Sequence, residues 1–145
     1  MESRIELAIE KKHSGMNCAQ AVACTYCDFA GLDEETISAI TQGMGSGIGA
    51  TMDGTCGALT GASVVAGLMN KETGRAKAIK DCKFIMSSFK ERNGEVTCKA
   101  LKGIETGVVL RSWDECVRDA AEFLEKIIEE DNWRGWIRII SIDSE

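Results

Sequence analysis

The stretch from Gly43 to Gly67 constrains the fold more than any other part of the chain, and its two halves differ in character. Glycine fills every second position from Gly43 to Gly49, which allows tight turns and positive φ angles. From Thr55 onward the residues are small and almost all apolar, a pattern typical of a helix that is buried on all sides. We therefore predict that the chain turns at the glycines and then forms a central buried helix from Cys56 to Met69, with Thr55 as its N-cap.

Apolar residues recur at helical spacing along most of the remaining chain. Asn17, Asp33 and Ser112 are suitable N-caps, and Glu115 completes a capping box with Ser112. The further predicted helices cover residues 5–14, 17–30, 33–42, 78–93, 97–102 and 112–128. No strand pattern accompanies them, so we predict an all-α fold. It is a compact single-domain bundle of about five to seven helices around a central helix rich in small residues.

The C-terminal residues 131–145 form a tail rich in aromatic residues and isoleucine, which we separate from a cysteine-motif helical domain spanning residues 1–130. The β-branched side chains of the tail are compatible with a short edge strand or an interfacial flap, and periodicity does not decide between them. Trp133, Trp136 and the following isoleucines would then supply a surface for a partner.

Composition excludes two classes of partner. The net charge is −6, and lysine and arginine are scattered among acidic residues without forming a basic patch, so we expect no nucleic acid. The longest apolar run, Ala58 to Met69, is too short to span a bilayer, so we expect no membrane. The N-terminal residues are charged and amphipathic and lack the apolar core of a signal peptide, which predicts a cytoplasmic protein.

Seven cysteines are many for 145 residues. In a reducing compartment, abundant cysteine indicates a metal site, a cluster or a reactive thiol, because stable disulfides are rare there. Four of the seven follow a predicted N-cap or lie in the first turn of a predicted helix, where the helix dipole can lower a thiol pKa. These four are Cys18, Cys56, Cys98 and Cys116. Packing as small buried apolar residues is the alternative for each of them.

The other cysteines and the single histidine lack this placement. Cys24 and Cys27 form a CxxC inside a helical pattern and not at a helix start, so we interpret them as packing thiols, with a vicinal redox pair as the alternative. Cys82 lies on a regular apolar stripe and is interpreted as part of the core. His13 precedes Cys18 and could join a metal site, but a histidine at a helix C-terminus more often contacts the last carbonyl groups.

The glycine-rich stretch does not have the spacing of a nucleotide-binding loop. A dinucleotide site needs a third glycine where this chain has Ile48 or Ala50, and no Gly-Lys-Ser/Thr sequence follows for a phosphate loop. The stretch could instead surround a thiolate or a sulfur cluster with its N–H groups, or it could be a flexible connection between two helices. The glycines expected to support a sulfur site are Gly43, Gly45, Gly47, Gly49, Gly54, Gly57 and Gly61.

The sequences NCAQAV at 17–22 and GTCGALTGA at 54–62, with single later cysteines at 98 and 116, resemble the C_GCAxxG_C_C family of redox-active proteins. The resemblance covers residues 5–125. It implies a small helical protein whose four recurring cysteines perform redox or metal-cluster chemistry, in a family related to domains fused with cytochrome or iron–sulfur modules. Carried over to this chain, the four are Cys18, Cys56, Cys98 and Cys116. Cys24, Cys27, Cys82 and the tail lie outside the pattern.

These observations lead to three hypotheses. In the first, Cys18, Cys56, Cys98 and Cys116 bind a cofactor as metal ligands, and an iron–sulfur cluster or another metal transfers electrons to a redox partner protein. In the second, a metal-free protein cycles its cysteines between thiol and disulfide. In the third, the cysteines only pack, and the chain is a structural or interaction module. We also expect a homodimer.

Overall fold

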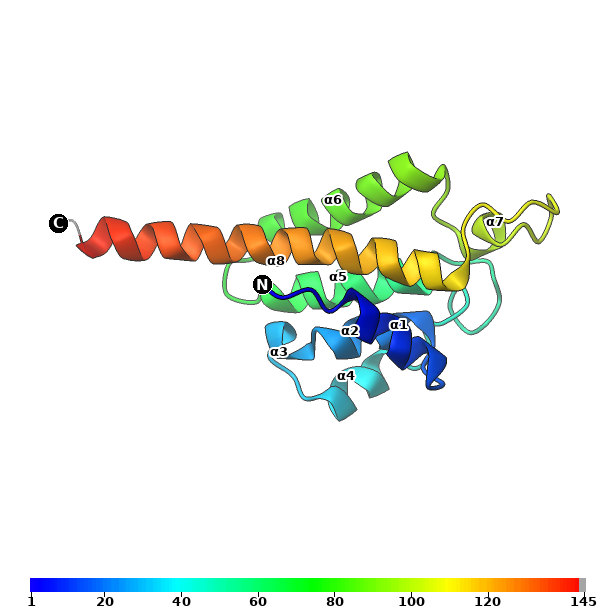
Figure 1. Cartoon of the computed structure of the whole chain (residues 1–145), viewed down its shortest axis with the longest axis horizontal. Helices are drawn as coiled ribbons and strands as arrows, with labels where there is room; N and C mark the ends of the chain where they lie inside the picture. Colours follow the sequence, from blue (N-terminus) through cyan, green and yellow to red (C-terminus); the bar gives the residue numbers. More distant parts are fainter. Residues whose placement is uncertain (144–145) are drawn as a thin grey trace.

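Eight helices make up the chain in the computed structural model, which describes residues 1–143 (Figure 1). These residues contain no strand, apart from one isolated bridge between Thr55 and Thr97. The helices are α1 (Ile5–His13), α2 (Cys18–Thr25), α3 (Cys27–Ala30), α4 (Glu34–Thr41), α5 (Gly57–Met69), α6 (Arg75–Asn93), α7 (Cys98–Leu101) and α8 (Trp113–Asp143). The all-α prediction is confirmed, with slightly more helices than predicted.

The predicted caps explain where three of the helices begin. Asn17 accepts a hydrogen bond from the backbone N–H of Gln20, and the Gln20 side chain accepts one from the backbone N–H of Asn17. Asp33 accepts a backbone N–H bond in the first turn of α4. Ser112 accepts the N–H of Glu115 at the start of α8. Each cap pairs a donor that the helix itself leaves unpaired, so these helix starts follow from the local sequence.

The predicted helix at 17–30 is interrupted at Tyr26, which ends α2 and precedes α3. The Arg4 guanidinium donates to the carbonyl of Thr25 at 3.0 Å. The Tyr26 hydroxyl donates to the buried carboxylate of Glu125 in α8. These contacts join residues far apart in the chain, and they hold the backbone away from a continuous helical path. Local periodicity carries no information about them, which is why the break was not predicted.

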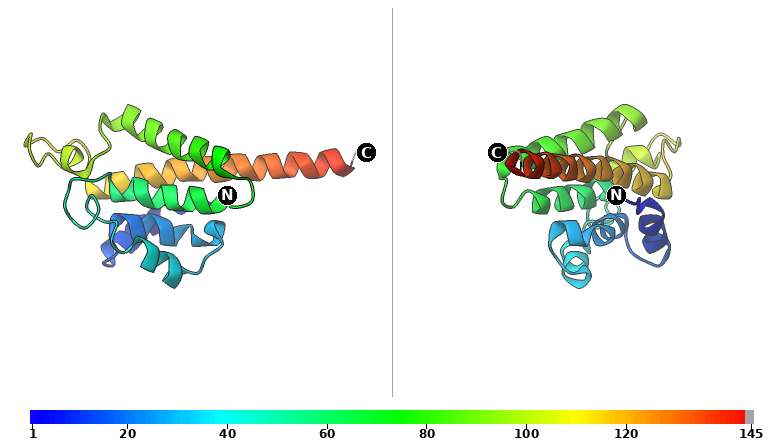
Figure 2. Two further views of the ribbon diagram at one scale, coloured as in Figure 1. Left: turned by 180° about the vertical axis from the view of Figure 1, so that it is seen from behind. Right: turned by 60° about the vertical axis from the view of Figure 1, so that its left-hand side comes forward.

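Helix α5 lies at the centre of the bundle, as its apolar composition predicted. It packs against α2 and α3 on one side and against α6 and α8 on the other (Figures 1 and 2). Small residues permit the close approach of α2, because a Cβ added to Gly61 would lie 2.4 Å from the carbonyl oxygen of Ala19. The core is therefore built around the helix that is rich in small residues.

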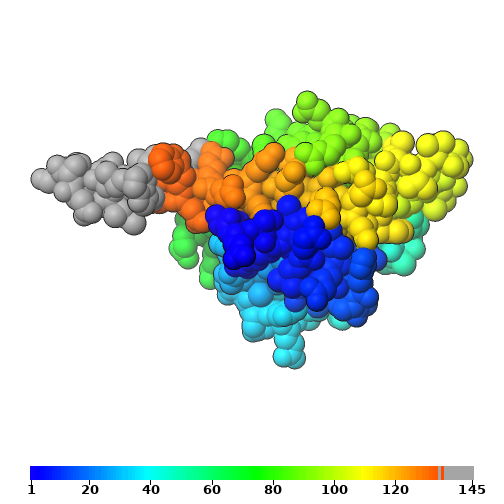
Figure 3. All heavy atoms as spheres, viewed as in Figure 1, coloured from blue at the N-terminus to red at the C-terminus, as the bar shows by residue number. Residues whose placement is uncertain are grey.

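The start of the chain packs along the last helix (Figure 3). The backbone N–H of Arg4 donates to Glu125 at 2.8 Å, and Arg118 forms an ion pair with Glu6 at 2.8 Å. Ala8 lies fully buried on the inner face of α1. These contacts fix α1 against α8 and so place the beginning of α2 beside the bundle core.

Residues 131–143 continue α8 as a helix. The sequence was compatible with a short edge strand or an interfacial flap in this region. An existing helix extends without a new nucleation step, and each isoleucine lowers helix propensity by less than about 1 kcal/mol. The side chains of Trp136 and the isoleucines after it lie outside the part of the chain that the structure describes, so a partner surface there stays a prediction. No helix within the described residues is long and apolar enough to cross a membrane.

Asp119 in α8 is a buried carboxylate that joins α8 to the preceding loop and to the end of α6. It is 1 % exposed and accepts hydrogen bonds from Arg92, Asn93 and Arg111 at 2.9–3.0 Å. Burial alone would raise the pKa of Asp119, but these hydrogen bonds outweigh burial and lower it. The folded protein therefore favours the ionised form of this side chain.

We expect Asp119→Asn to lower the free energy of unfolding by about 2 kcal/mol at pH 7, because the variant turns an amide donor toward the donors that surround it. The folded pKa lies below the unfolded value of about 3.9, so the wild-type protein has this stability above about pH 4 and loses it as the pH falls toward the folded pKa. Urea unfolding at pH 7 and at about pH 3.5 measures both effects. The prediction would be contradicted if acid lowered the free energy of unfolding equally in the wild-type protein and in Asp119→Asn.

Candidate functional site

Four helix starts gather at one end of the bundle, and each carries one of the four predicted site cysteines (Figure 1). Cys18 is the first residue of α2, Cys98 is the first residue of α7, and Cys116 lies in the first turn of α8. Cys56 is itself the N-cap of α5, one residue later than the predicted cap Thr55. We refer to Cys18, Cys56, Cys98 and Cys116 as the thiol cluster.

A backbone bridge fixes Cys56 beside Cys98. The N–H of Cys56 donates to the carbonyl of Val96 at 2.8 Å, and the N–H of Cys98 donates to the carbonyl of Gly54 at 3.0 Å. These two bonds form the isolated bridge. Because each cysteine follows the bridge directly at a helix start, the bridge also sets the positions from which α5 and α7 begin.

Glycine at position 57 brings the start of α2 against the start of α5. A Cβ added to Gly57 would lie 3.4 Å from the Cβ of Cys18 and 3.3 Å from the backbone nitrogen of Ala19. A larger side chain would push the two helix starts apart. Gly57 therefore permits the close approach of Cys18 to Cys56.

Cys56 and Cys116 interact electrostatically within the thiol cluster. The interaction with the Cys116 thiol is the main reason why the pKa of Cys56 is lowered. The N–H groups of Ala58 and Leu59 act in the same direction, whereas burial and Cys18 oppose them. The same interaction with Cys56, followed by burial, raises the pKa of Cys116. The two thiols therefore do not ionise independently, and the thiolate is favoured at Cys56 over Cys116.

At Cys18 and Cys98, burial raises the thiol pKa, whereas we predicted that the helix dipole would lower it. The thiol cluster is between 0 and 3 % exposed. Burial raises the pKa of Cys18 to about 11 and also raises the pKa of Cys98. A helix N-terminus stabilises a nearby charge by about 0.3–2 kcal/mol, which is less than the hydration that a buried thiolate loses. The prediction of a lowered thiol pKa is therefore wrong for Cys18 and Cys98 because of burial, and wrong for Cys116 mainly because of Cys56. The pKa of Cys56 is lowered as predicted, but its main cause is Cys116 and the backbone N–H groups at the helix start contribute less.

The loop before α5 follows a left-handed path. The residues with positive φ are Ser46, Gly47, Ile48, Gly49, Ala50 and Met52, with φ between 48° and 74°. This conformation is rare for a β-branched residue such as Ile48 and costs roughly 1–2 kcal/mol per non-glycine residue. Backbone bonds hold it in place, among them Gly49 N–H to Gly43 carbonyl at 2.8 Å and Met52 N–H to Ser46 carbonyl at 2.9 Å. The glycine-rich stretch is therefore a hydrogen-bonded structure.

The seven glycines expected to support a sulfur site fall into two groups. A Cβ added to Gly43 or Gly49 would meet no close neighbour. A Cβ at each of the other five would lie 2.4–3.3 Å from another atom; these are Gly45, Gly47, Gly54, Gly57 and Gly61. Of these, Gly47 faces the Cβ of Cys98 and Gly57 faces the Cβ of Cys18. Two glycines of the predicted set thus contact the thiol cluster directly.

Two further residues belong to the site and were not found from the sequence. The Cys98 thiol donates to the Sδ atom of Met52 at 3.6 Å. The Nζ atom of Lys102 lies 3.4 Å from the Sγ atom of Cys116. Lys102 follows Cys98 by four residues, so the helical period starting from the cysteine was the one signal that could have indicated it.

The other three cysteines and the single histidine take no part in these interactions. Cys24 is buried in the core, and Cys27 and Cys82 pack against it. His13 at the end of α1 forms an exposed ion pair with Asp114 at 2.7 Å. None of these four residues contributes to the hydrogen bonds of the thiol cluster.

The thiol cluster does not have the arrangement of a metal centre. Among the side chains that the structure describes, no three from His, Cys, Asp or Glu are placed so that they could hold one ion. The Cys98 thiol is hydrogen-bonded to the Met52 sulfur. The ammonium group of Lys102 lies beside the Cys116 sulfur, where its charge would repel a metal cation. An iron–sulfur cluster or a tetrahedral metal ion therefore does not fit these four cysteines as they are placed.

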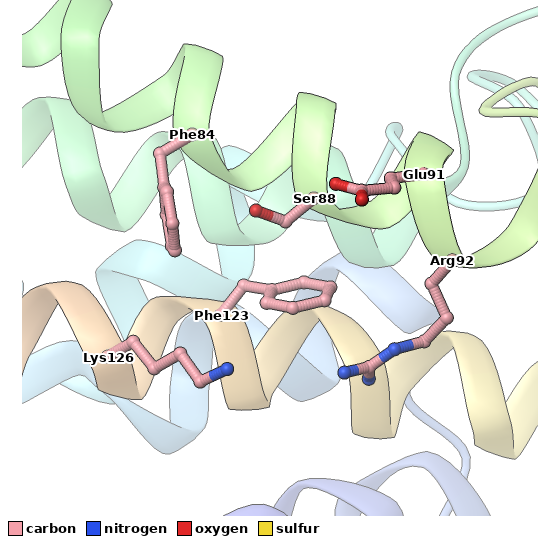
Figure 4. A pocket seen from close by; sticks show the side chains of 6 residues that line it. All are labelled: Phe84, Ser88, Glu91, Arg92, Phe123 and Lys126. Carbon is pink, nitrogen blue, oxygen red and sulfur yellow. The ribbon is translucent and has the colours of Figure 1, made fainter.

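A cleft of about 390 Å³ lies between α6 and α8 and contains no cysteine (Figure 4). It is lined by Phe84, Ser88, Glu91, Arg92, Phe123 and Lys126. Arg92 and Lys126 both lie over the ring of Phe123. The charge of Arg92 is already paired with Asp119 and Glu122, and the cleft offers no thiol.

The fold and the site together define a class: a small all-α protein that gathers four buried cysteines at converging helix starts. The chain matches the family described as "Putative redox-active protein (C_GCAxxG_C_C)" over residues 16–127, a range that contains all four cysteines. It therefore belongs to this family, and the resemblance seen in the sequence is confirmed. Comparison with curated proteins and with solved structures gave no match.

Proposed function

We propose that the protein performs thiol–disulfide redox chemistry through Cys56 and Cys116. The single observation that carries this proposal is the convergence of the helix starts that bear Cys56 and Cys116, where the two thiols interact electrostatically and the thiolate is favoured at Cys56. Two such cysteines supply a two-electron couple within one chain. Membership of a redox-active family supports the same chemistry.

Cys56 acts as the nucleophile. Its thiolate attacks one sulfur of a small external disulfide, RSSR, to form a mixed disulfide and release one thiolate, RS⁻. The Cys116 thiol gives its proton to this RS⁻, and the Cys116 sulfur then attacks the Cys56 sulfur. The Cys56–Cys116 bond forms, the second RS⁻ leaves and takes up the proton that Cys56 had lost. The protein is oxidised by two electrons, and RSSR is reduced to two RSH.

Burial favours a small reactant. Cys56 is 2 % exposed and Cys116 is fully buried. Exchange requires direct contact between the attacking sulfur and the disulfide, so a folded protein could not deliver its own disulfide to this pair without displacing the helix starts. A low-molecular-weight disulfide meets this constraint with a smaller opening of the site.

Mapping the oxidised protein tests this proposal. We expect treatment with a small disulfide, followed by alkylation and peptide mass spectrometry, to give a Cys56–Cys116 disulfide, with a mixed disulfide at Cys56 as its precursor. Cys116→Ser should stop the reaction at the mixed disulfide, because the second sulfur is missing. Cys82→Ser is the matched control and should leave the Cys56–Cys116 product unchanged. Absence of this linkage in the fully oxidised wild-type protein would overturn the proposal.

Metal binding is the second candidate, and the observation that favours it is the placement of four buried cysteines at converging helix starts. An iron–sulfur cluster held by Cys18, Cys56, Cys98 and Cys116 would supply one-electron transfer, but it requires these side chains to rearrange. Protein purified without oxygen distinguishes the two candidates. Iron and sulfide in stoichiometric amounts would support the metal site, whereas metal-free protein that forms the Cys56–Cys116 bond supports the thiol couple.

Three expectations from the sequence accompany this proposal: a cytoplasmic location, a redox partner protein and a homodimer. The supporting argument for the first is the abundance of free cysteine, which a reducing compartment preserves. Reduction of the oxidised pair requires a second thiol, and a redox partner protein would supply it only if the helix starts open to admit it. Division into a cysteine-motif helical domain at 1–130 and a C-terminal tail rich in aromatic residues and isoleucine at 131–145 is also proposed.

A further inference from the structure

We propose that Lys102 is a catalytic residue of this exchange and that its ammonium group stabilises the Cys116 sulfur as a thiolate. The inference rests on the function proposed above. The Nζ atom of Lys102 lies 3.4 Å from the Sγ atom of Cys116, one of the two reacting atoms. A hydrogen bond from a charged donor is about twice as strong as one between neutral groups.

Two neighbours hold the ammonium group in this position. It donates to the carbonyl oxygen of Arg111 at 2.7 Å and lies 4.3 Å from the ring centre of Trp113. The carbonyl and the aromatic face both attract a cation without neutralising it. The long lysine side chain is thus directed at the Cys116 sulfur by the loop and the first residue of α8.

The charge of Lys102 is left available to the thiols. Within the part of the chain whose side chains the structure describes, no carboxylate forms an ion pair with Lys102. Its neighbour Lys99 differs, because it is paired with Asp53 at 2.8 Å and with Glu105 at 3.3 Å on the surface. The two lysines belong to the same short segment, yet only Lys102 is directed at the thiol cluster.

Lys102 acts mainly on Cys116, the thiol with which Cys56 forms the disulfide. Its charge favours the thiolate at Cys116, and it does so also at Cys18 and Cys98. The pKa of Cys56 is set mainly by the Cys116 thiol, burial, Cys18 and backbone N–H groups. Removal of Lys102 should therefore slow the second step, in which Cys116 attacks, and leave the first step at Cys56 nearly unchanged.

The same contact assists the reverse reaction. When an external thiolate attacks the Cys56 sulfur of the Cys56–Cys116 disulfide, that bond breaks and its electron pair leaves on Cys116. The Lys102 ammonium group is already in place to receive this charge. A stabilised leaving thiolate accelerates exchange, so Lys102 should act on both reduction and oxidation of the pair.

The test is a single-turnover reaction of the full chain with 4,4′-dithiodipyridine, a neutral disulfide whose approach does not depend on the charge of Lys102. Acid quenching and peptide mass spectrometry then follow the Cys56 adduct and the Cys56–Cys116 disulfide separately. We expect Lys102→Met to slow conversion of adduct to disulfide about ten-fold while adduct formation keeps its rate. Its pH profile for conversion should move upward by about one unit. Lys102→Arg should recover most of the rate.

Lys99→Met is the matched control, since it removes a cation from the same segment without changing the thiol cluster. Circular dichroism establishes that each variant is folded, and Lys102→Arg keeps the test informative if Lys102→Met is not. Unchanged conversion and an unchanged pH profile in Lys102→Met would overturn the role of Lys102 alone. Failure of the wild-type protein to convert the adduct into the Cys56–Cys116 disulfide would overturn the proposed function, and the role of Lys102 with it.

Discussion

Replacement of Gly61 by alanine is expected to lower the free energy of unfolding by about 3 kcal/mol, because the added methyl group collides with backbone. The new Cβ would lie 2.4 Å from the carbonyl oxygen of Ala19 and 3.0 Å from its Cα atom. Backbone cannot rotate away as a flexible side chain can, so α2 must move off α5. Urea unfolding followed by circular dichroism measures the loss.

Gly67→Ala provides the matched control on the same helix. A Cβ added to Gly67 would meet no atom within 4 Å. This substitution should stabilise the protein by about 0.5–1 kcal/mol, since alanine has the higher helix propensity. If both variants gained stability, the close contact between α2 and α5 would not exist in solution. The difference between the two variants isolates the contact from the helix propensity of alanine.

The contact at Gly61 also explains how much of the fold could be predicted. The small and apolar composition of α5 identified it as central, because that signal is local. Which helix approaches it at Gly61 is decided by packing across the whole chain, and periodicity does not report it. The break at Tyr26 is missed for the same reason, since Arg4 and Glu125 cause it from distant parts of the chain.

The site was predicted in part for a comparable reason. N-caps are local, so the helix starts at Cys18, Cys56, Cys98 and Cys116 were found to within one residue. The pKa of each thiol depends on burial and on its neighbours in space, and burial outweighed the helix terminus at Cys18 and Cys98. Lys102 follows Cys98 by one helical period, but its contact with Cys116 depends on how α7 and α8 are placed relative to one another, which no local pattern encodes.

The left-handed loop shows a further limit of reading glycine from sequence. Alternating glycines predicted positive φ at some positions, but Ser46, Ile48, Ala50 and Met52 also adopt it. For non-glycine residues this conformation is unfavourable, and it persists where the surrounding contacts determine it. Here the loop is held by its own backbone bonds and by the packing of Gly47 on Cys98. The strain therefore lies directly beside the thiol cluster.

Replacement of Gly47 by alanine should lower the free energy of unfolding by about 3 kcal/mol and open the loop over Cys98. Position 47 has φ +74°, which alanine adopts poorly, and the new Cβ would lie 2.8 Å from the backbone of Met52. Displacement of Met52 would break its contact with the Cys98 thiol. We therefore expect Cys98 to react faster with 4,4′-dithiodipyridine, measured by peptide mass spectrometry under native conditions.

Gly49→Ala separates strain from collision in this loop. Position 49 also has a positive φ, +63°, but the new Cβ would approach only the Thr51 methyl group, at 3.9 Å. Gly49→Ala should lower the free energy of unfolding by about 1 kcal/mol and leave the reactivity of Cys98 unchanged. Equal effects of the two variants would mean that the left-handed backbone alone protects the thiol. A larger effect at Gly47 would instead assign that protection to the contact between the loop and Cys98, so that movement of this loop controls access to the thiol cluster.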